Sequence, residues 1–261
     1  MGYVARSKVS FLIRDEADRM LDMGFYDDIM QIVKLLPKER QTLLFSATMP
    51  PKIKMLAQNI LRDPAEVKLS VSKPADKIDQ SAYVLYETQK LPVLRHVFRN
   101  FKNSKSIVFA SSKLKCKELG KTLRGMNLPV GEMHSDLDQN QREDMLLAFK
   151  SGKKKILVAT DIMARGIDID DIDLVVNYDV PHECEDYVHR VGRTARAEKY
   201  GVAITFVAEK EIVKFKAIEL FIGKEIRKNE VPSDLGETPD YNVSSSSGKG
   251  RNKKKKKSGK K

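Results

Sequence analysis

Three acids stand close together near the start of the chain, in the run Asp15-Glu16-Ala17-Asp18. They follow a short apolar run at residues 9–13, which is typical of a strand. Acids at the carboxyl end of a parallel strand lie where α/β folds bind ligands. Phosphoryl transfer needs one carboxylate to hold Mg²⁺ and another group to orient the attacking water, and Asp15 and Glu16 suit these roles. The alternative is a helix N-terminus enriched in acids because of its dipole.

Short hydroxyl residues form a second candidate site. The run Ser46-Ala47-Thr48 follows another apolar run, at residues 42–45. Its hydroxyls can bridge to a neighbouring carboxylate such as Asp18. Ser and Thr are also common caps before a helix, and that alternative is the stronger one for this run by itself.

Arginine supplies a third kind of chemistry. Arg193 and Arg196 are three residues apart, so one helical face can direct both at one polyphosphate. The planar guanidinium donates several hydrogen bonds and suits the spread charge of a phosphoryl transition state. Residues 159–168 follow a further strand and contain Thr160 and Asp168. A surface arginine cluster is the alternative for Arg193 and Arg196.

The elements that must position these residues follow from the apolar pattern. Apolar runs separated by helical stretches of 10–15 residues indicate βαβ units and a largely parallel sheet. The fold class is therefore α/β. Beyond residue 77, strands are predicted at 81–87, 106–110, 130–134, 155–160, 174–178 and 201–208, and helices at 90–102, 113–126, 139–150, 183–193 and 209–223.

The domain organisation is uneven. Residues 1–69 supply only two strands, with one helix predicted to about Leu36 and another at 51–61, which is too little for an independent open sheet. Residues 70–76 have the polar, proline-containing composition of a linker. Residues 77–232 contain one whole α/β domain. Residues 233–261 are rich in serine and lysine and are predicted to form a disordered tail.

The net charge of +12 is concentrated in that tail. Residues 248–261 hold nine Lys/Arg and no acid, and removing these nine charges leaves +3 on residues 1–247. The tail is either an electrostatic tether for polyanions or a solubilising charge run. No apolar run approaches the length of a membrane span. The two cysteines, Cys116 and Cys184, belong to no Cys/His cluster, which indicates reduced thiols and a cytoplasmic location.

Taken together, six ordered segments resemble the DEAD-box ATP-dependent RNA helicase family. The resemblance implies one complete RecA-like domain preceded by a partial RecA-like domain and followed by a basic tail. The Arg-Thr-Ala-Arg-Ala ending, with Ala195 where many members have Gly, resembles the bacterial RhlE-like subgroup. The matching segments are residues 15–18, 46–48, 109–113, 139–142, 159–170 and 189–197.

The resemblance also implies ATP and Mg²⁺ as cofactors and assigns catalytic roles. Asp15 is expected to hold Mg²⁺ through water, and Glu16 to act on the hydrolytic water. Arg193 and Arg196 are expected to be arginine fingers that also bind the nucleotide. Asp168 is expected to approach the ribose.

Further roles concern coupling and RNA. RNA contacts would be largely independent of sequence, because they are made to phosphates and 2′-hydroxyls. Ribosomal or RNA-degradation partners are possible but not specified by the sequence. The residues expected to couple nucleotide state to RNA release are Asp18, Ser46, Thr48 and His189. The residues expected to bind RNA are Ser112, Lys113, Gln139, Arg142 and Thr160.

Three departures from the family pattern stand out. Arg14 replaces an aliphatic residue, which is costly if the strand is buried. Ser135 replaces a usual glycine, which can alter a close backbone approach to phosphate. The 261 residues contain no G-x-x-x-x-G-K-[ST] phosphate loop. We therefore expect a fragment or a truncated product without meaningful ATPase activity alone. The alternatives are a non-catalytic RNA-binding module and, less favoured, a DNA helicase of a related branch.

Overall fold

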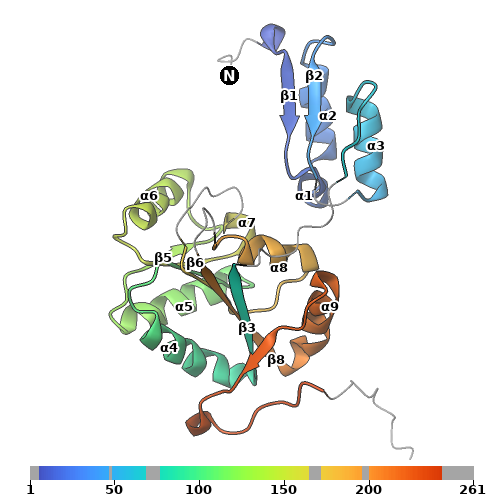
Figure 1. Cartoon of the computed structure of the whole chain (residues 1–261). Helices are drawn as coiled ribbons and strands as arrows, with labels where there is room; N and C mark the ends of the chain where they lie inside the picture. The colour runs from blue at the N-terminus through green and yellow to red at the C-terminus, as the bar shows by residue number, and fades with distance from the viewer. Residues whose placement is uncertain (1–5, 47–48, 69–76, 165–171, 196–199, 243–261) are drawn as a thin grey trace, which may run out of the picture. The chain divides into compact units, whose positions relative to one another are not determined.

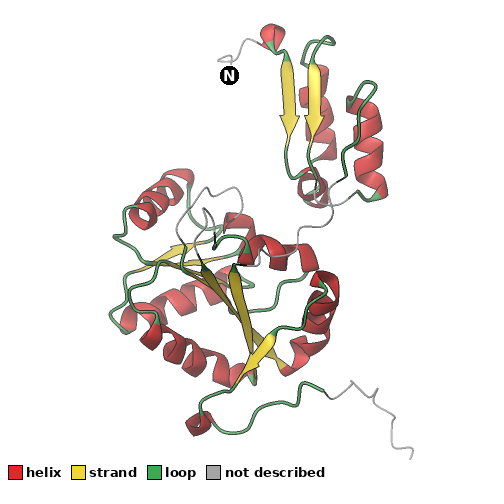
Figure 2. Cartoon of the chain, in the orientation of Figure 1, coloured by secondary structure: helices red, strands yellow, loops and turns green. Residues whose placement is uncertain are grey.

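The chain divides into two compact units, Met1–Ser72 and Lys73–Lys261, which are drawn in Figures 1 and 2. Each unit builds its own sheet and its own buried apolar core. The computed structural model describes residues 6–46, 49–68, 77–164, 172–195 and 200–242.

The first unit holds a two-stranded parallel sheet. β1 (Phe11–Arg14) pairs with β2 (Gln41–Leu44) over four aligned positions. The sequence predicts one helix to about Leu36, but the structure has two. Gly24 lies between them with a φ of 82°, a left-handed conformation that commonly follows the end of a helix. The helices of this unit are α1 (Ala17–Asp22), α2 (Tyr26–Lys34) and α3 (Pro51–Ile60).

The core of the first unit is small, and one face of its sheet is open. Phe11 and Ile13 are each 60% exposed, although alternate positions of a strand normally bury an apolar face. Phe45, just beyond β2, is 53% exposed. The buried apolar cluster comprises Ala17, Leu21, Ile29, Ile53, Leu56 and Ile60.

The second unit contains a seven-stranded sheet in the order β5-β6-β4-β7-β8-β3-β9, and each pairing is parallel. The predicted α/β class with a parallel sheet is thereby confirmed. Central strands are buried on both faces, as apolar runs such as Ile-Leu-Val-Ala in β6 require. The strands are β3 (Ile78–Leu85), β4 (Ser106–Phe109), β5 (Val130–Met133), β6 (Ile156–Ala159), β7 (Leu174–Asn177), β8 (Gly201–Ala208) and β9 (Arg227–Asn229).

Helices cover both faces of this sheet (Figure 2). One apolar cluster joins α4 and α5 to one face, and another joins α6, α8 and α9 to the opposite face. Within the described ranges, every helix is too short or too polar to cross a lipid bilayer. The helices are α4 (Lys90–Asn100), α5 (Lys113–Gly125), α6 (Gln139–Lys150), α7 (Asp161–Ala164), α8 (Cys184–Val191) and α9 (Ile212–Ile222).

The predicted boundary of the disordered tail at residue 233 is wrong. Residues 233–242 pack on the second unit, where Gln89 Nε2 donates to the carbonyls of Leu235 and Glu237 at 2.8 and 3.0 Å. Tyr241 stacks edge-on against Phe215, with ring centroids 6.4 Å apart. These side-chain anchors hold a segment whose composition alone indicates disorder. Residues 243–261 lie outside the described residues.

Candidate functional site

The acidic segment comes directly after the carboxyl end of β1. Glu16 has a left-handed backbone, with φ of 50° and ψ of 45°, immediately before α1. Non-glycine residues seldom adopt this conformation, and such strain is concentrated at functional sites. The Asp15 side chain is exposed, and its Oδ1 accepts the Glu16 N–H at 2.8 Å. The chain turns sharply here and leaves the Asp15 carboxylate accessible to a ligand.

Ser46 meets the acidic segment from the end of β2. Its Oγ accepts the backbone N–H of Asp18 at 3.2 Å, and the Ala17 N–H donates to the carbonyl of Phe45 at 3.1 Å. The sequence predicts a bridge from a hydroxyl to the Asp18 carboxylate. The structure brings Ser46 and Asp18 together, with this hydrogen bond made to the backbone. Thr48 lies outside the described residues.

Arg14, at the end of β1, is half-buried. Its Nη1 lies 3.7 Å from the Met20 Sδ, while its Nε and Nη2 atoms are buried without a hydrogen-bond partner among the described residues. Such atoms lose hydration without regaining hydrogen bonds. The destabilisation expected for a charge at this position is therefore present in part, because the strand is only partly covered.

In the second unit, the segments expected to contact RNA follow adjacent strands. Ser112 comes after β4, His134 after β5 and Thr160 after β6, and these three strands are neighbours in the sheet. The Thr160 N–H donates to the carbonyl of Met133 at 3.3 Å, so two of the loops touch. The strands are parallel, and their carboxyl ends therefore meet at one edge, where α/β folds bind ligands. We call this the carboxyl edge.

Lys113 is held at the carboxyl edge by an acid. Its Nζ lies 2.8 Å from Asp136 Oδ1, and Lys117 Nζ lies 2.6 Å from Asp136 Oδ2. Hydrogen bonds from these two lysines lower the pKa of Asp136 to about 2. The adjacent Ser112 caps α5, since its Oγ accepts the Lys115 N–H at 3.3 Å. Ser112 and Lys113 are thus fixed by the start of one helix.

Gln139 and Arg142 lie on the first turn of α6. Asp138 caps this helix by accepting the Gln141 N–H at 2.8 Å, and Gln139 Nε2 donates to Glu143 Oε1 at 2.8 Å. The Nε atom of Arg142 is buried and has no hydrogen-bond partner among the described residues. A buried donor in that condition calls for a partner, which a bound anion can supply.

The backbone at Ser135 does not require a glycine in this structure. It is an exposed turn residue after His134, and its φ is not among the positive values found in the described part of the chain. The buried His134 accepts the N–H of Asp136 on Nδ1 at 3.3 Å, which closes the turn. The departure from the family glycine is therefore tolerated by the backbone.

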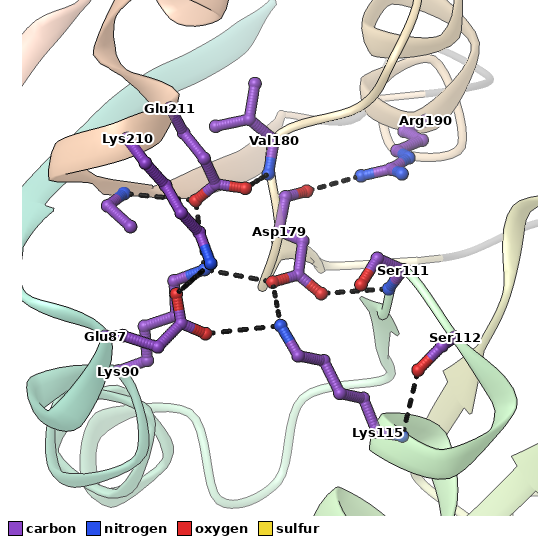
Figure 3. Close-up of polar contacts among 11 residues, drawn as sticks. Glu87, Lys90, Ser111, Ser112, Lys115, Asp179, Val180, Arg190, Lys210 and Glu211 are labelled. Atoms are coloured by element: carbon purple, nitrogen blue, oxygen red, sulfur yellow. Dashed lines mark hydrogen bonds and ion pairs between the residues drawn. The ribbon is translucent and has the colours of Figure 1, made fainter.

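A buried polar network centred on Asp179 adjoins the carboxyl edge (Figure 3). Asp179 Oδ1 accepts from Lys90 Nζ at 2.9 Å and from Lys115 Nζ at 2.7 Å. Its Oδ2 accepts the Ser111 N–H at 2.9 Å. Lys90 Nζ also lies 3.0 Å from Glu211 Oε2. Asp179 follows β7, so this carboxylate joins the segments after β4 and β7.

Opposite charges decide the ionisation of this network. Burial alone raises the pKa of Asp179, but Lys90 and the hydrogen bond from Lys115 outweigh it and hold that pKa well below its ordinary value of 3.8. Burial lowers the pKa of Lys90, but Asp179 and Glu211 raise it above 10.5. Burial also opposes the charge of Lys115, yet Asp179 and Glu87 raise its pKa to about 12. With their pKa values shifted in these directions, Asp179, Lys90 and Lys115 are all charged at neutral pH.

Arg190 extends the network toward β6. Its Nε and Nη2 donate to the two carboxylate oxygens of Asp161 at 2.6 and 2.7 Å, and its Nη1 donates to the carbonyl of Asp179 at 2.8 Å. A bidentate pair fixes orientation as well as charge. Arg190 is 3% exposed, so it ties the segments after β6 and β7 together rather than facing a ligand.

The expected arginine fingers are described only in part. Arg193 is half-buried two residues beyond α8, and His189 lies on α8 itself. Ala195 has a φ of 57°, in the left-handed region that favours glycine. Gly201, the first residue of β8, allows the backbone at Ala195 to come close, because a Cβ on residue 201 would lie 2.7 Å from the Ala195 nitrogen. Two further expected nucleotide contacts lie outside the described residues, namely Asp168 and Arg196.

Sequence reasoning missed the Asp179 network, although a signal was present. Lys90 occupies the same stripe of α4 as Val93 and Leu94, where a charge is unusual. Asp161 and Asp179 each come within two residues of a fully buried strand. A charged residue on an apolar stripe, with acids following neighbouring strands, indicates a buried ion pair.

Protein-family comparisons match both units. The DEAD/DEAH box helicase family matches residues 3–56, and the helicase conserved C-terminal domain matches residues 89–198. DbpA of Bacillus subtilis is 39% identical over 233 residues, covering 89% of this chain and 49% of that protein. DEAD-box ATP-dependent RNA helicase 40 of rice is 41% identical over 241 residues, covering 91% and 30%. The chain thus spans less than half the length of these relatives.

Solved structures give the same assignment. Dbp5 of S. cerevisiae bound to RNA and ADP BeF3 is 31% identical with a TM-score of 0.78, covering 87% of this chain and 61% of that chain. A DEAD box protein from Methanococcus jannaschii is 38% identical with a TM-score of 0.57 and the same coverages. Motif order, parallel sheet and these similarities agree. The chain belongs to the DEAD-box ATP-dependent RNA helicase family.

Proposed function

We propose that this chain is part of an ATP-dependent RNA helicase in which RNA-stimulated ATP hydrolysis drives local unwinding of an RNA duplex. One observation carries the proposal: both units end their parallel strands in groups suited to phosphates. These are Asp15 and Glu16 after β1, and Ser112, Lys113 and Thr160 at the carboxyl edge. Ligands of α/β folds bind at such ends.

The proposed domains follow the family. Residues 1–69 correspond to the end of the ATP-binding RecA-like domain, residues 70–76 to a linker, and residues 77–232 to the second RecA-like domain. The two apolar clusters on opposite faces of the seven-stranded sheet support the second assignment.

The acidic segment is assigned to the metal and the water. Mg²⁺ is usually held by one or two carboxylates together with substrate phosphates, and the exposed carboxylate of Asp15 fits that pattern. Within the described residues, no group of three or more potential ligands forms a complete protein cage. Mg²⁺ would neutralise the phosphate charge when bound. Glu16 is assigned to orienting the attacking water, and Arg193, Arg196 and Asp168 to the nucleotide.

Coupling and RNA binding are assigned to the remaining residues. The Ser46–Asp18 hydrogen bond supports a role in coupling, because it links the end of β2 to the start of α1. The position of Lys113 supports contact with RNA phosphates, and so does the buried Arg142 Nε, which has no hydrogen-bond partner among the described residues. The other coupling assignments are Thr48 and His189, and the other RNA assignments are Ser112, Gln139 and Thr160.

We infer that these 261 residues do not hydrolyse ATP alone, because the sequence contains no phosphate loop. A coupled ATPase assay with RNA tests this, with Glu16→Gln as the diagnostic variant and the exposed Glu39→Gln as its matched control. Neither variant should change a background rate. Turnover that Glu16→Gln abolishes and Glu39→Gln preserves would overturn the inference.

A second candidate function is a non-catalytic RNA-binding module. The completeness of the seven-stranded sheet favours it, since the carboxyl edge needs no other segment to form. Binding should prefer single-stranded RNA over DNA and weaken with salt. Lys113→Gln and Arg142→Gln should each weaken binding several-fold, while the exposed Lys150→Gln should not. Deleting residues 248–261 should lower both affinity and its salt dependence if the tail is a tether.

The proposal extends to the subgroup and to the cellular compartment. The Arg-Thr-Ala-Arg-Ala ending supports the bacterial RhlE-like subgroup, while similar proteins include both bacterial and plant helicases. The free thiols of Cys116 and Cys184 support a reducing, cytoplasmic compartment. Fractionation of the source cells, followed by detection of the chain, tests the location.

A further inference from the structure

A hollow between α4 and α5 presents three cations. It has a volume of about 690 Å³ and is lined by Arg95 and Arg99 from α4 and by Lys121 and Thr122 from α5. All three cations are exposed, and within the described ranges their side chains make no hydrogen bond or ion pair. Glu118 is the one acid in the lining. We call this hollow the basic groove.

The basic groove is connected to the carboxyl edge by a stripe of lysines on α5. Lys113, Lys117 and Lys121 are all exposed and are spaced by four residues, so each step advances about 6 Å along one side of the helix. Figure 1 shows α4 and α5 side by side, and buried residues of both helices belong to one apolar cluster. The stripe therefore begins at a proposed RNA contact and ends in the groove.

We infer that the basic groove is a second contact for the sugar–phosphate backbone of single-stranded RNA, reached by a strand that leaves the carboxyl edge along α5. The inference rests on the proposed RNA-binding function. Arginine forks match phosphate geometry, and the Thr122 hydroxyl adds a further donor. Three cations against Glu118 give the lining a clear positive excess.

An acidic peptide is the less favoured occupant. Arginine clusters also bind acidic peptide motifs, but most of the affinity of a peptide interface comes from a few buried anchors, chiefly aromatic residues and arginine, in fitted pockets. The groove offers Met126 as its one large apolar side chain. The exposed Leu114 of α5 is not part of the lining. Repeated cations in line with an RNA-contacting helix start suit a uniform polyanion better than a side-chain-specific ligand.

The path predicts a length dependence. α5 has 13 residues and is about 20 Å long, so a strand that covers only the carboxyl edge does not reach the groove. A longer strand engages both contacts on one molecule, which raises its apparent affinity. Binding through the groove should be insensitive to base sequence, because the contacts are to phosphates.

The test is fluorescence anisotropy of the full chain with labelled oligouridylates of about 5 and about 15 nucleotides over a salt series. The groove variant is Arg95→Gln, Arg99→Gln and Lys121→Gln combined. The matched control combines Lys150→Gln, Lys153→Gln and Lys224→Gln, which removes three exposed cations elsewhere on the same unit. Lys113→Gln reports separately on the carboxyl edge.

We expect the groove variant to bind the long RNA about tenfold more weakly, with a salt slope shallower by about 2, and to bind the short RNA as the parent does. The control should change neither. Equal weakening for both lengths, an equal effect of the control, or weakening for a polyglutamate peptide but not for RNA would overturn the groove assignment. If Lys113→Gln leaves the short RNA unaffected, the proposed carboxyl-edge site fails instead, and a parent chain that binds neither RNA overturns both.

Discussion

The two sheets of this molecule place polar groups at the ends of parallel strands but support them very differently. In the described part of the first unit, the sheet consists of β1 and β2, and Phe11, Ile13 and Phe45 are each more than half exposed. In the second unit, helices cover both faces, and central residues such as Val108 and Val176 are wholly buried. Similar chemistry at a strand end therefore does not imply a similarly rigid platform.

The contrast extends to charge. In the first unit, the Arg14 guanidinium keeps two buried nitrogens without partners among the described residues. In the second unit, the wholly buried Lys90 has Asp179 and Glu211 within 3.0 Å. Buried charges are tolerated where geometry and partners are complete, and are destabilising where they are not. The ion pairs of the second unit thus fix the segments that follow its strands.

The largest expected difference between the units is in local opening. Amide hydrogen exchange, read by mass spectrometry, should show β1 and β2 protected at least about 100-fold less than β4 and β7. The reason is the small cluster of buried residues in the first unit and the two extensive clusters in the second. Equal protection of the two sheets would remove the comparison.

The next largest effect should come from Lys90→Met. Removing one partner of a buried ion pair is expected to destabilise the second unit by about 3 kcal/mol, because Glu211 and Asp179 lose their shared cation. The comparison variant is Lys115→Met, whose side chain is 32% exposed and whose loss leaves Asp179 paired with Lys90, so it should destabilise the second unit clearly less than Lys90→Met does. Urea unfolding followed separately in each unit measures both. Equal losses for the two variants would contradict the ranking.

Acid should weaken the second unit through Asp179. The pKa of Asp179 in the folded state lies below its ordinary value of 3.8. As the pH falls, the unfolded chain therefore binds this proton first, and the ionised carboxylate contributes its full stabilisation only above about pH 4. It is lost as the pH falls below about 4 toward the folded-state pKa, by about 1.4 kcal/mol for each pKa unit of separation. Asp179→Asn should flatten this acid limb in urea titrations, whereas the exposed Asp234→Asn should leave it unchanged.

The smallest expected effect is at Ala195. Its φ of 57° is strained for alanine, so Ala195→Gly should stabilise the second unit by up to about 1 kcal/mol. Ala217→Gly, at an exposed position inside α9, should instead destabilise it by about 1 kcal/mol. Thermal unfolding of both variants gives the two signs. Destabilisation by Ala195→Gly would show that this backbone is not strained.

Strong periodic patterns were enough to predict most elements. The strand at 201–208 and the helix at 139–150 agree with β8 and α6 at both ends, because apolar content and capping residues mark them clearly. β9 was missed, because Arg-Lys-Asn carries no apolar signal and pairs only at the sheet edge. The 233–242 segment was missed because its anchors, Gln89 and Phe215, are distant in sequence.

The site could be predicted only where residues are close in sequence. Asp15 and Glu16 are adjacent, so their position after a strand is enough to predict an acidic site without a structure. The link from Ser46 to Asp18 was anticipated because each follows a neighbouring strand. The link from Lys90 to Asp179 was not, since it depends on the order of β3, β7 and β8 in the sheet. Strand order cannot be read from local patterns.

The Asp179 carboxylate has a consequence for how substitutions in this chain combine. The carboxylate accepts hydrogen bonds from Lys90, Lys115 and Ser111 at once, and the backbone carbonyl of Asp179 accepts one from Arg190. Effects of changes at these positions should therefore not add, and the penalty of one will depend on which others are already present. Single substitutions at several of these positions would each report the loss of the same shared interaction. During evolution, these positions are expected to be substituted together or to stay unchanged.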